Sequence, residues 1–341
     1  MNLPSIFERY RSEVDSELRS IFVDHHLPLY QMMQYHLGWT DENGRHIEGT
    51  SGKALRPTLC LLACEAAGEY FHKALPAAAA IELVHNFSLI HDDIQDNDHE
   101  RRHRPTVWSI WGIPQAINVG DGMRSVASLA LLRLEDRDVP TEKQQRVQCL
   151  LDESCLRMIE GQYLDLSYED RFDITVEDYL EMIDRKTAAI MSCALQTGAI
   201  IGTDDESVIK CLREFGRNIG LAFQIKDDII GIWGDQDKTG KPLASDIRRK
   251  KKSLPVVYTL QSASGTTRED ISNVYKKPSI TDHEVGKVLD ILDDVQAKAY
   301  AERMAEEYRN SALIELGKIR LSPWAKAHLE EIAYFLVERD F

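Results

Sequence analysis

Two pairs of aspartates occur in apolar helical segments, the first of them at the end of its segment, and both pairs could hold a metal ion. Asp92 and Asp93 close the apolar segment 75–96, and Asp96 follows Asp92 by one helical turn. Carboxylates on one helical face repel each other unless a cation compensates them. Mg²⁺ takes oxygen ligands, typically one or two carboxylates together with substrate phosphates. The pattern therefore predicts a magnesium site for a phosphorylated substrate; the alternative is a solvated helix end.

The second pair, Asp227 and Asp228, lies in another apolar segment that extends to Asp235. Asp227, Gly231 and Asp235 are spaced by four residues and therefore follow one helical face. A glycine inside a helix costs about 1 kcal/mol relative to alanine. Its presence indicates either the close approach of a ligand or a neighbouring helix, or a glycine that is merely tolerated. The aspartate pairs at 204–205 and 293–294 lack apolar and basic surroundings, and we expect them to be solvated.

Each aspartate motif is followed by a basic cluster, at 101–104 and at 248–252, and Lys241 precedes the second cluster. Taken alone, either cluster could be a solvated face, a localisation signal or an RNA-binding patch. A net charge of −15 argues against nucleic-acid binding. Basic residues beside acidic ones suit a polyanion that is bound through a bridging metal.

The chain is predicted to be all-α and to form a single domain over residues 1–341. Strand patterns are nearly absent, whereas helical periodicity is long and has few breakers. We expect helices at 75–96, 177–202, 207–235 and 284–316. Loops are expected at 38–52, 99–106, 112–122, 203–206, 235–246 and 262–280.

The composition favours a cytoplasmic protein with a substantial core. Hydrophobic residues make up 43% of the 341 residues, and no apolar run approaches the ~18 residues of a membrane helix. The first residues lack the apolar stretch of a secretory signal. Cys60 and Cys64 lie in an apolar run, so we expect buried thiols rather than half of a zinc site.

The motifs, in their order along nearly the whole chain, resemble those of the trans-prenyltransferases, also called polyprenyl synthases. These motifs are the two aspartate motifs, the segment Ser51–Pro57, the sequence Glu-Leu-Val-His that ends at His85, the cluster at 101–104 and the pair Lys186-Thr187. The resemblance implies an isoprenoid-synthase-like bundle of long helices around a deep central cavity, usually as a homodimer. It also implies Mg²⁺-assisted ionisation of an allylic diphosphate, followed by condensation with isopentenyl diphosphate.

The resemblance also implies a role for individual residues. Asp92 and Asp96 would bind two Mg²⁺ ions with help from Asp93, and Asp227 would bind a third, supported by Asp228 and Gln224. The allylic diphosphate would be contacted by residues from both halves of the chain, namely Arg101, Lys186, Thr187, Lys241 and Lys251. Isopentenyl diphosphate would bind to Lys53, Arg56, His85 and Arg102.

Some positions depart from the usual pattern of the family. Ser51 stands at a common glycine, Ala54 at a common arginine, His103 at the glycine of Arg-Arg-Gly-x-Pro-Thr, Gly231 at a frequent third aspartate, and Lys250 at a frequent glycine. Ala54 removes one positive charge from the first basic motif, whereas Gly231 leaves Asp227 intact.

Two other functions are consistent with parts of the sequence. A class I terpene cyclase on the same fold would share the metal motifs, but it has no second substrate to hold, and the isopentenyl diphosphate residues favour elongation. A regulatory subunit without activity is disfavoured because both aspartate motifs are intact. The resemblance also implies that Phe87, five residues before the first motif and followed by the small Ser88, limits product length to fifteen or twenty carbons; the alternative is an ordinary core residue.

Overall fold

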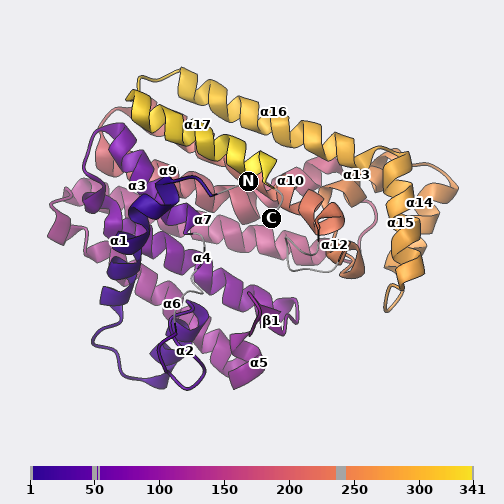
Figure 1. The fold of residues 1–341 in the computed structure, drawn as a ribbon, viewed down its shortest axis with the longest axis horizontal. Coiled ribbons are helices and arrows are strands. Elements are labelled where there is room, and N and C mark those ends of the chain that lie inside the picture. Colours follow the sequence, from indigo (N-terminus) through magenta and orange to yellow (C-terminus); the bar gives the residue numbers. More distant parts are fainter. Residues whose placement is uncertain (1–2, 48–51, 53, 236–242, 340–341) are drawn as a thin grey trace. The chain divides into compact units, whose positions relative to one another are not determined.

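The computed structural model describes residues 3–47, 52, 54–235 and 243–339 of the 341 (Figure 1). Nearly all regular structure in this part of the chain is helical, which confirms the all-α prediction. Ser51, Lys53 and Lys241 lie outside the described residues. The chain forms two compact units, and we describe each by itself.

The first unit, which we call the N-terminal unit, comprises residues 4–152 and 194–209. Its central helix α4 is buried nearly all round because it is apolar on most sides, and it packs against α1, α3 and α6. The elements in chain order are α1 (Ile6–Ile21), α2 (Pro28–His36), α3 (Leu55–Ala67), η1 (Phe71–Ala74), α4 (Leu75–Gln95), β1 (Glu100–Arg101), β2 (Arg104–Pro105), α5 (Val107–Trp111), α6 (Ile113–Leu132) and η2 (Glu135–Arg137).

The second unit, which we call the C-terminal unit, includes residues 153–193 and 210–341. Within it α16 and α17 lie side by side, and α13, α14 and α15 contact one another (Figure 1). Its own elements are α8 (Val176–Ile183), the π-helix η3 (Asp184–Ala188), α12 (Ser245–Arg248), α13 (Leu254–Ser262), α14 (Thr266–Tyr275), α15 (Asp282–Asp294), α16 (Ala297–Gly317) and α17 (Pro323–Glu338). Three helices contribute residues to both units: α7 (Thr141–Tyr168), α9 (Ala189–Gly202) and α10 (Glu206–Trp233).

Several predicted boundaries are confirmed and others are wrong. The helix expected at 75–96 is α4, and Cys60 and Cys64 are fully buried as expected. The loop expected at 112–122 is instead the first half of α6. Pro114 occupies the first turn of that helix, where proline is tolerated. Gly120 leaves room for the His91 ring, since a Cβ there would lie 2.2 Å from His91 Nε2.

Two further predictions in the last third of the chain are wrong. The single helix expected at 284–316 is interrupted between α15 and α16, where Gln296 adopts a left-handed conformation with φ of 55°. A left-handed residue ends a helix, and the hydrophobic periodicity on either side does not reveal it. The loop expected at 262–280 contains α14.

The helix expected at 177–202 contains the π-helix at Asp184–Ala188, which carries Lys186 and Thr187. π-helical turns are rare and frequently occur at functional sites. The backbone of this turn lies against Gly161 of α7, where a Cβ would come within 2.2 Å of the Lys186 backbone nitrogen. Gly161 therefore permits two helical backbones to meet at Lys186.

Three of the departures from the family pattern fall at left-handed backbone positions. Ala54, His103 and Lys250 have φ of 47°, 60° and 57°. His103 and Arg102 are the two central residues between β1 and β2, and both have positive φ, as the favoured two-residue hairpin turn requires. Glycine is common at such positions because it has no Cβ to clash, which explains the glycine that the family usually has at 103 and 250.

We therefore expect His103→Gly to stabilise the protein by about 1 kcal/mol, because the left-handed conformation costs a residue with a Cβ roughly that much. The melting temperature, measured by differential scanning calorimetry, should rise by about 1–2 °C. Glu100→Gly is the matched control: Glu100 lies in β1 and is not among the left-handed residues, so glycine there should lower the melting temperature. Equal changes in melting temperature for the two variants would contradict the assignment of an unfavourable left-handed backbone at His103.

Candidate active site

The first aspartate motif forms the last turn of α4. The helix continues to Gln95, and the backbone N–H of Asp96 donates to Asp92 O at 2.8 Å, so the two aspartates keep their i, i+4 relation. Asp92 is half-buried and Asp96 is exposed. Carboxylates at the negative end of a helix dipole favour a nearby cation. The oxygen donors and their position therefore fit Mg²⁺.

Asp93 differs from its neighbours because its side chain is only 2% exposed. Its Oδ1 accepts a hydrogen bond from Arg101 Nε at 2.7 Å, and its Oδ2 is buried with no hydrogen-bond partner in the described structure. Burial raises the pKa of Asp93 to about 6, against the opposing effect of Arg101. Asp93 thus orients Arg101, one of the residues expected to contact the allylic diphosphate.

A buried polar cluster lies next to Arg102 in the N-terminal unit. Glu82 is 9% exposed; burial raises its pKa, while the charges of Arg56 and Arg102 oppose this. Burial lowers the pKa of Arg102, and burial together with the nearby arginines lowers that of His85 well below its ordinary value, so His85 is neutral. Asn86 Nδ2 donates to Glu82 Oε1 at 3.2 Å. The cluster holds more positive than negative charge and therefore suits an anion.

The predicted residues Arg56, His85 and Arg102 thus lie in one electrostatic environment, but sequence reasoning missed Glu82 and Asn86. A signal was present, because these are polar residues one helical turn apart in the apolar segment 75–96. Glu82, Asn86 and Arg102 also line a small pocket together with Gly52 and Ala54. A Cβ at Gly52 would lie 2.7 Å from the Arg102 guanidinium, so the first basic motif contacts Arg102 directly.

Phe87 lies on α4 between this cluster and the aspartate motif. Its side chain is 5% exposed, and its ring meets His91 edge-on at a centroid distance of 5.8 Å. The Ser88 hydroxyl donates to His85 O at 2.8 Å. Phe87 is therefore packed, as either of its two expected roles requires.

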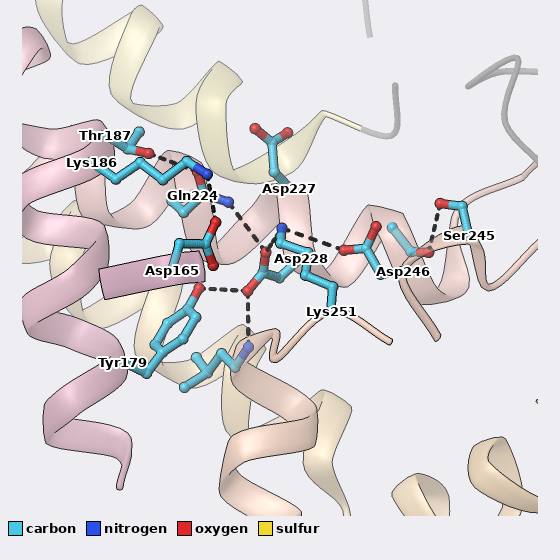
Figure 2. A network of polar contacts seen from close by, with 12 residues as sticks. Asp165, Tyr179, Lys186, Thr187, Gln224, Asp227, Asp228, Ser245, Asp246 and Lys251 are labelled. Atoms are coloured by element: carbon cyan, nitrogen blue, oxygen red, sulfur yellow. Dashed lines mark hydrogen bonds and ion pairs between the residues drawn. The ribbon is translucent and has the colours of Figure 1, made fainter. Parts of the chain in front are cut away.

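The second aspartate motif places its two carboxylates in different surroundings, and Figure 2 shows them pointing apart. The Asp227 side chain is 37% exposed, and its Oδ1 accepts a hydrogen bond from Arg339 at 2.6 Å. Arg339 follows α17, donates also to Phe223 O and lies over the Phe223 ring at 4.2 Å. Sequence reasoning missed Arg339, since a lone arginine after an amphipathic helix carries no local signal.

Asp228, in contrast, is fully buried and accepts four hydrogen bonds. Oδ1 accepts from Gln224 Nε2 at 3.2 Å and from Lys251 Nζ at 2.8 Å. Oδ2 accepts from the Tyr179 hydroxyl at 2.5 Å and from the Leu254 backbone nitrogen at 2.8 Å. These are all the acceptor positions that a carboxylate offers, so Asp228 acts as a structural anchor in the C-terminal unit.

The two predicted lysines that the structure describes in this unit, Lys186 and Lys251, are held by carboxylates. Lys186 Nζ donates to Asp165 at 2.5 Å (Figure 2). Burial alone would lower the pKa of Lys251, but the carboxylates of Asp228 and Asp246 outweigh it and raise the pKa well above its ordinary value. Both lysines are therefore positioned cations that suit a diphosphate.

Gly231 has a packing reason in the structure. A Cβ at this position would lie 2.4 Å from Asp246 Oδ2, and Ser245 Oγ donates to Gly231 O at 3.2 Å. Gly231 therefore admits the carboxylate that also contacts Lys251, at 3.5 Å. This supports the first of the two interpretations of the glycine, close approach, although what approaches is a side chain of the protein.

The predicted residues that the structure describes divide between the two units. Asp92, Asp93, Asp96, Arg101, Arg102, Arg56 and His85 belong to the N-terminal unit, and Lys186, Thr187, Gln224, Asp227, Asp228 and Lys251 to the C-terminal unit. Within the described residues, no three His, Cys, Asp or Glu side chains form a ready-made metal site. No helix in the described part of the chain is long and apolar enough to cross a membrane.

Comparison with known proteins confirms the resemblance. The sequence model of the polyprenyl synthetase family matches residues 38–292. The (2E,6E)-farnesyl diphosphate synthase of Mycobacterium tuberculosis is 37% identical over 91% of this chain and 86% of its own length. The geranylgeranyl diphosphate synthase of the same organism is 38% identical, over 94% and 90%. The crystal structure of a polyprenyl synthetase from Streptomyces coelicolor has a TM-score of 0.91 at 35% identity, over 98% of this chain and 99% of that one. The chain therefore belongs to the polyprenyl synthetase family.

Proposed function

We propose that the protein is a prenyltransferase that condenses isopentenyl diphosphate with an allylic diphosphate and makes a fifteen- or twenty-carbon product. The observation that carries the proposal is the cluster of Arg56, His85 and Arg102 beside the buried Glu82 and Asn86. It provides an anion site in addition to the two aspartate motifs. A terpene cyclase binds one diphosphate and has no use for this second site.

The residues of each unit have separable roles in this reaction. Asp92, Asp96 and Asp227 would hold divalent metal, which we propose to be three Mg²⁺ ions, and the metal would neutralise charge on the departing diphosphate. By the resemblance, Lys186, Lys251 and Arg101 would each contribute positive charge to the leaving group. Arg56 and Arg102 orient isopentenyl diphosphate, whose proton is lost after the new carbon–carbon bond forms. The departing diphosphate can accept that proton.

A product assay tests the function directly. Purified protein is incubated with Mg²⁺, isopentenyl diphosphate and an allylic diphosphate of five, ten or fifteen carbons, and product length is measured by mass spectrometry. Elongated prenyl diphosphates are expected. Release of hydrocarbon from an allylic diphosphate without consumption of isopentenyl diphosphate would indicate a cyclase instead, and no Mg²⁺-dependent turnover would indicate a regulatory subunit.

The two diphosphate sites should be separable by mutation. Lys53→Ala and Arg56→Ala are expected to raise the KM for isopentenyl diphosphate at least about tenfold, since each removes a charged hydrogen bond to that substrate. Lys186→Ala and Lys241→Ala should affect the allylic substrate or the rate of ionisation instead. Steady-state kinetics with each substrate varied in turn measures both effects. Lys326→Ala is the control and should leave both KM values unchanged, because Lys326 is exposed and pairs with Glu330. Equal effects on both substrates would contradict the assignment of two sites.

We also propose that the protein is a homodimer and that it acts in the cytoplasm. Helix α6 exposes large apolar residues: Ile113 and Ile117 near its start, and Leu129 and Leu132 near its end, each at least 44% exposed. They form two exposed apolar pairs, one at each end of the helix. Exposed apolar residues of this kind suit contact with a second copy, and light scattering of the purified protein measures the oligomeric state.

A further inference from the structure

The carboxylate of Asp228 connects parts of the C-terminal unit that carry predicted diphosphate-binding residues. Gln224, which donates to Asp228, accepts a hydrogen bond from the Thr187 hydroxyl at 2.8 Å. Lys251 donates to Asp228 from the other side (Figure 2). The anchor therefore lies between the Lys186-Thr187 pair and Lys251.

We propose that Tyr179 is a positioning residue for diphosphate binding, which acts through Asp228 on Lys251. The inference rests on the proposed function and concerns the same site. Tyr179 is not part of any motif that the sequence singled out, and it does not need to touch the substrate.

Tyr179 can have this role because its hydrogen bond fixes the orientation of the Asp228 carboxylate. The Tyr179 hydroxyl and the Leu254 backbone nitrogen hold Oδ2, which leaves Oδ1 directed at Lys251 and Gln224. Tyr179 itself is 1% exposed. Burial and the neighbouring Asp228 raise the pKa of Tyr179 well above its ordinary value, so the hydroxyl remains a hydrogen-bond donor.

Lys251 is the group through which the effect reaches a ligand. Its side chain is 33% exposed although its ammonium is anchored on the buried Asp228. A charged group held in advance at the place where charge develops stabilises a transition state without reorganisation. If the carboxylate can rotate, the ammonium loses its shorter contact and keeps the longer one to Asp246, at 3.5 Å, so the benefit for a bound diphosphate decreases.

The chain offers a matched control for the hydroxyl. Tyr275 is also buried in the C-terminal unit, at 4% exposure, but its hydroxyl has no hydrogen-bond partner among the described residues. Tyr179→Phe and Tyr275→Phe each remove one buried oxygen and keep the ring. Only the first change removes a hydrogen bond to Asp228.

The first experiment measures binding of inorganic pyrophosphate with Mg²⁺ to the full chain by calorimetry. Tyr179→Phe is expected to weaken binding about tenfold, the effect of losing one hydrogen bond to a charged acceptor, whereas Tyr275→Phe stays within twofold of the wild type. Circular dichroism verifies that both variants are folded. Equal affinities of the two variants would overturn the proposal. Because pyrophosphate needs no elongation activity, this result is independent of the product assay.

The second experiment separates positioning from a general structural effect by a double-mutant cycle. Tyr179→Phe should lower kcat about tenfold and leave the KM for isopentenyl diphosphate within twofold. In a Lys251→Ala background the same change should lower kcat less than threefold, because the group through which it acts is gone. A full tenfold loss in both backgrounds would show that Tyr179 does not act through Lys251 and would refute the proposal.

Discussion

Asp227→Asn is expected to lower kcat at least about a thousandfold at saturating Mg²⁺, and Asp92→Asn should do the same. Removing one group that stabilises developing negative charge typically costs 10²–10³ in rate, and a lost metal ligand also removes the cation that it holds. Asparagine keeps the size of the side chain and an oxygen that can accept the hydrogen bond from Arg339. The variant should therefore remain folded, and the measurement is steady-state turnover with Mg²⁺ titrated.

Asp204→Asn is the matched control for this change. Asp204 also belongs to an aspartate pair, but its side chain is 91% exposed and pairs with Lys143 at 2.9 Å, in line with the solvated role expected for it. Its replacement should leave kcat within twofold of the wild type. Near-normal turnover of either Asp92→Asn or Asp227→Asn would show that the metal ligands are other residues.

Phe87→Ala is expected to lengthen the main product by at least one five-carbon unit. In the family that the sequence resembles, the residue at this position commonly limits the growth of the prenyl chain. The structure shows that the Phe87 ring is buried and packs edge-on to His91. Displacing a packed aromatic side chain costs several kcal/mol, so a growing chain stops there, whereas alanine leaves space. Product lengths are compared by mass spectrometry with the same allylic substrate.

The control variant must be destabilised about as much as Phe87→Ala, since Phe→Ala in a core typically costs 3–5 kcal/mol. Phe22 is 4% exposed and meets Trp39 edge-on in the same unit. Phe22→Ala should destabilise the protein to a similar extent and leave product length unchanged. An unchanged product distribution in Phe87→Ala, or a wild-type product of thirty carbons or more, would show that Phe87 is a core residue only.

The sequence predicted the parts of the site whose chemistry is local. Asp92 and Asp96 needed only helical spacing and a long apolar segment before them; Asp92 lies in the last turn of α4 and Asp96 is its C-cap residue. His103 could be recognised as unusual from the resemblance alone, but its left-handed backbone gives the physical reason. For Gly231 the sequence left open a close approach or a merely tolerated glycine, and the identity of the approaching group, Asp246, depends on a fold that brings α12 to α10.

The parts that could not be predicted depend on contacts between residues distant in the chain. Arg339 reaches Asp227 across 112 positions, and Tyr179 reaches Asp228 across 49. Neither residue belongs to a periodic pattern or a motif that would indicate its partner. The break between α15 and α16 was missed for a different reason, because one left-handed residue changes the course of the chain without changing its hydrophobic pattern.

The π-helix at Asp184–Ala188 makes this part of the chain sensitive to the deletion of a single codon. A π-helical turn amounts to one extra residue within an α-helix, so the loss of a single codon between 184 and 188 would let α8 continue as a regular α-helix. Because the extra residue is absorbed within the π turn, the helix after the deletion would keep its orientation relative to α8, and only the residues inside the turn would shift around the helix axis. Such a deletion could spare both aspartate motifs and every basic residue outside this turn. The orientation of the Lys186-Thr187 pair thus depends on chain length at one point, which a comparison restricted to motif residues would not detect.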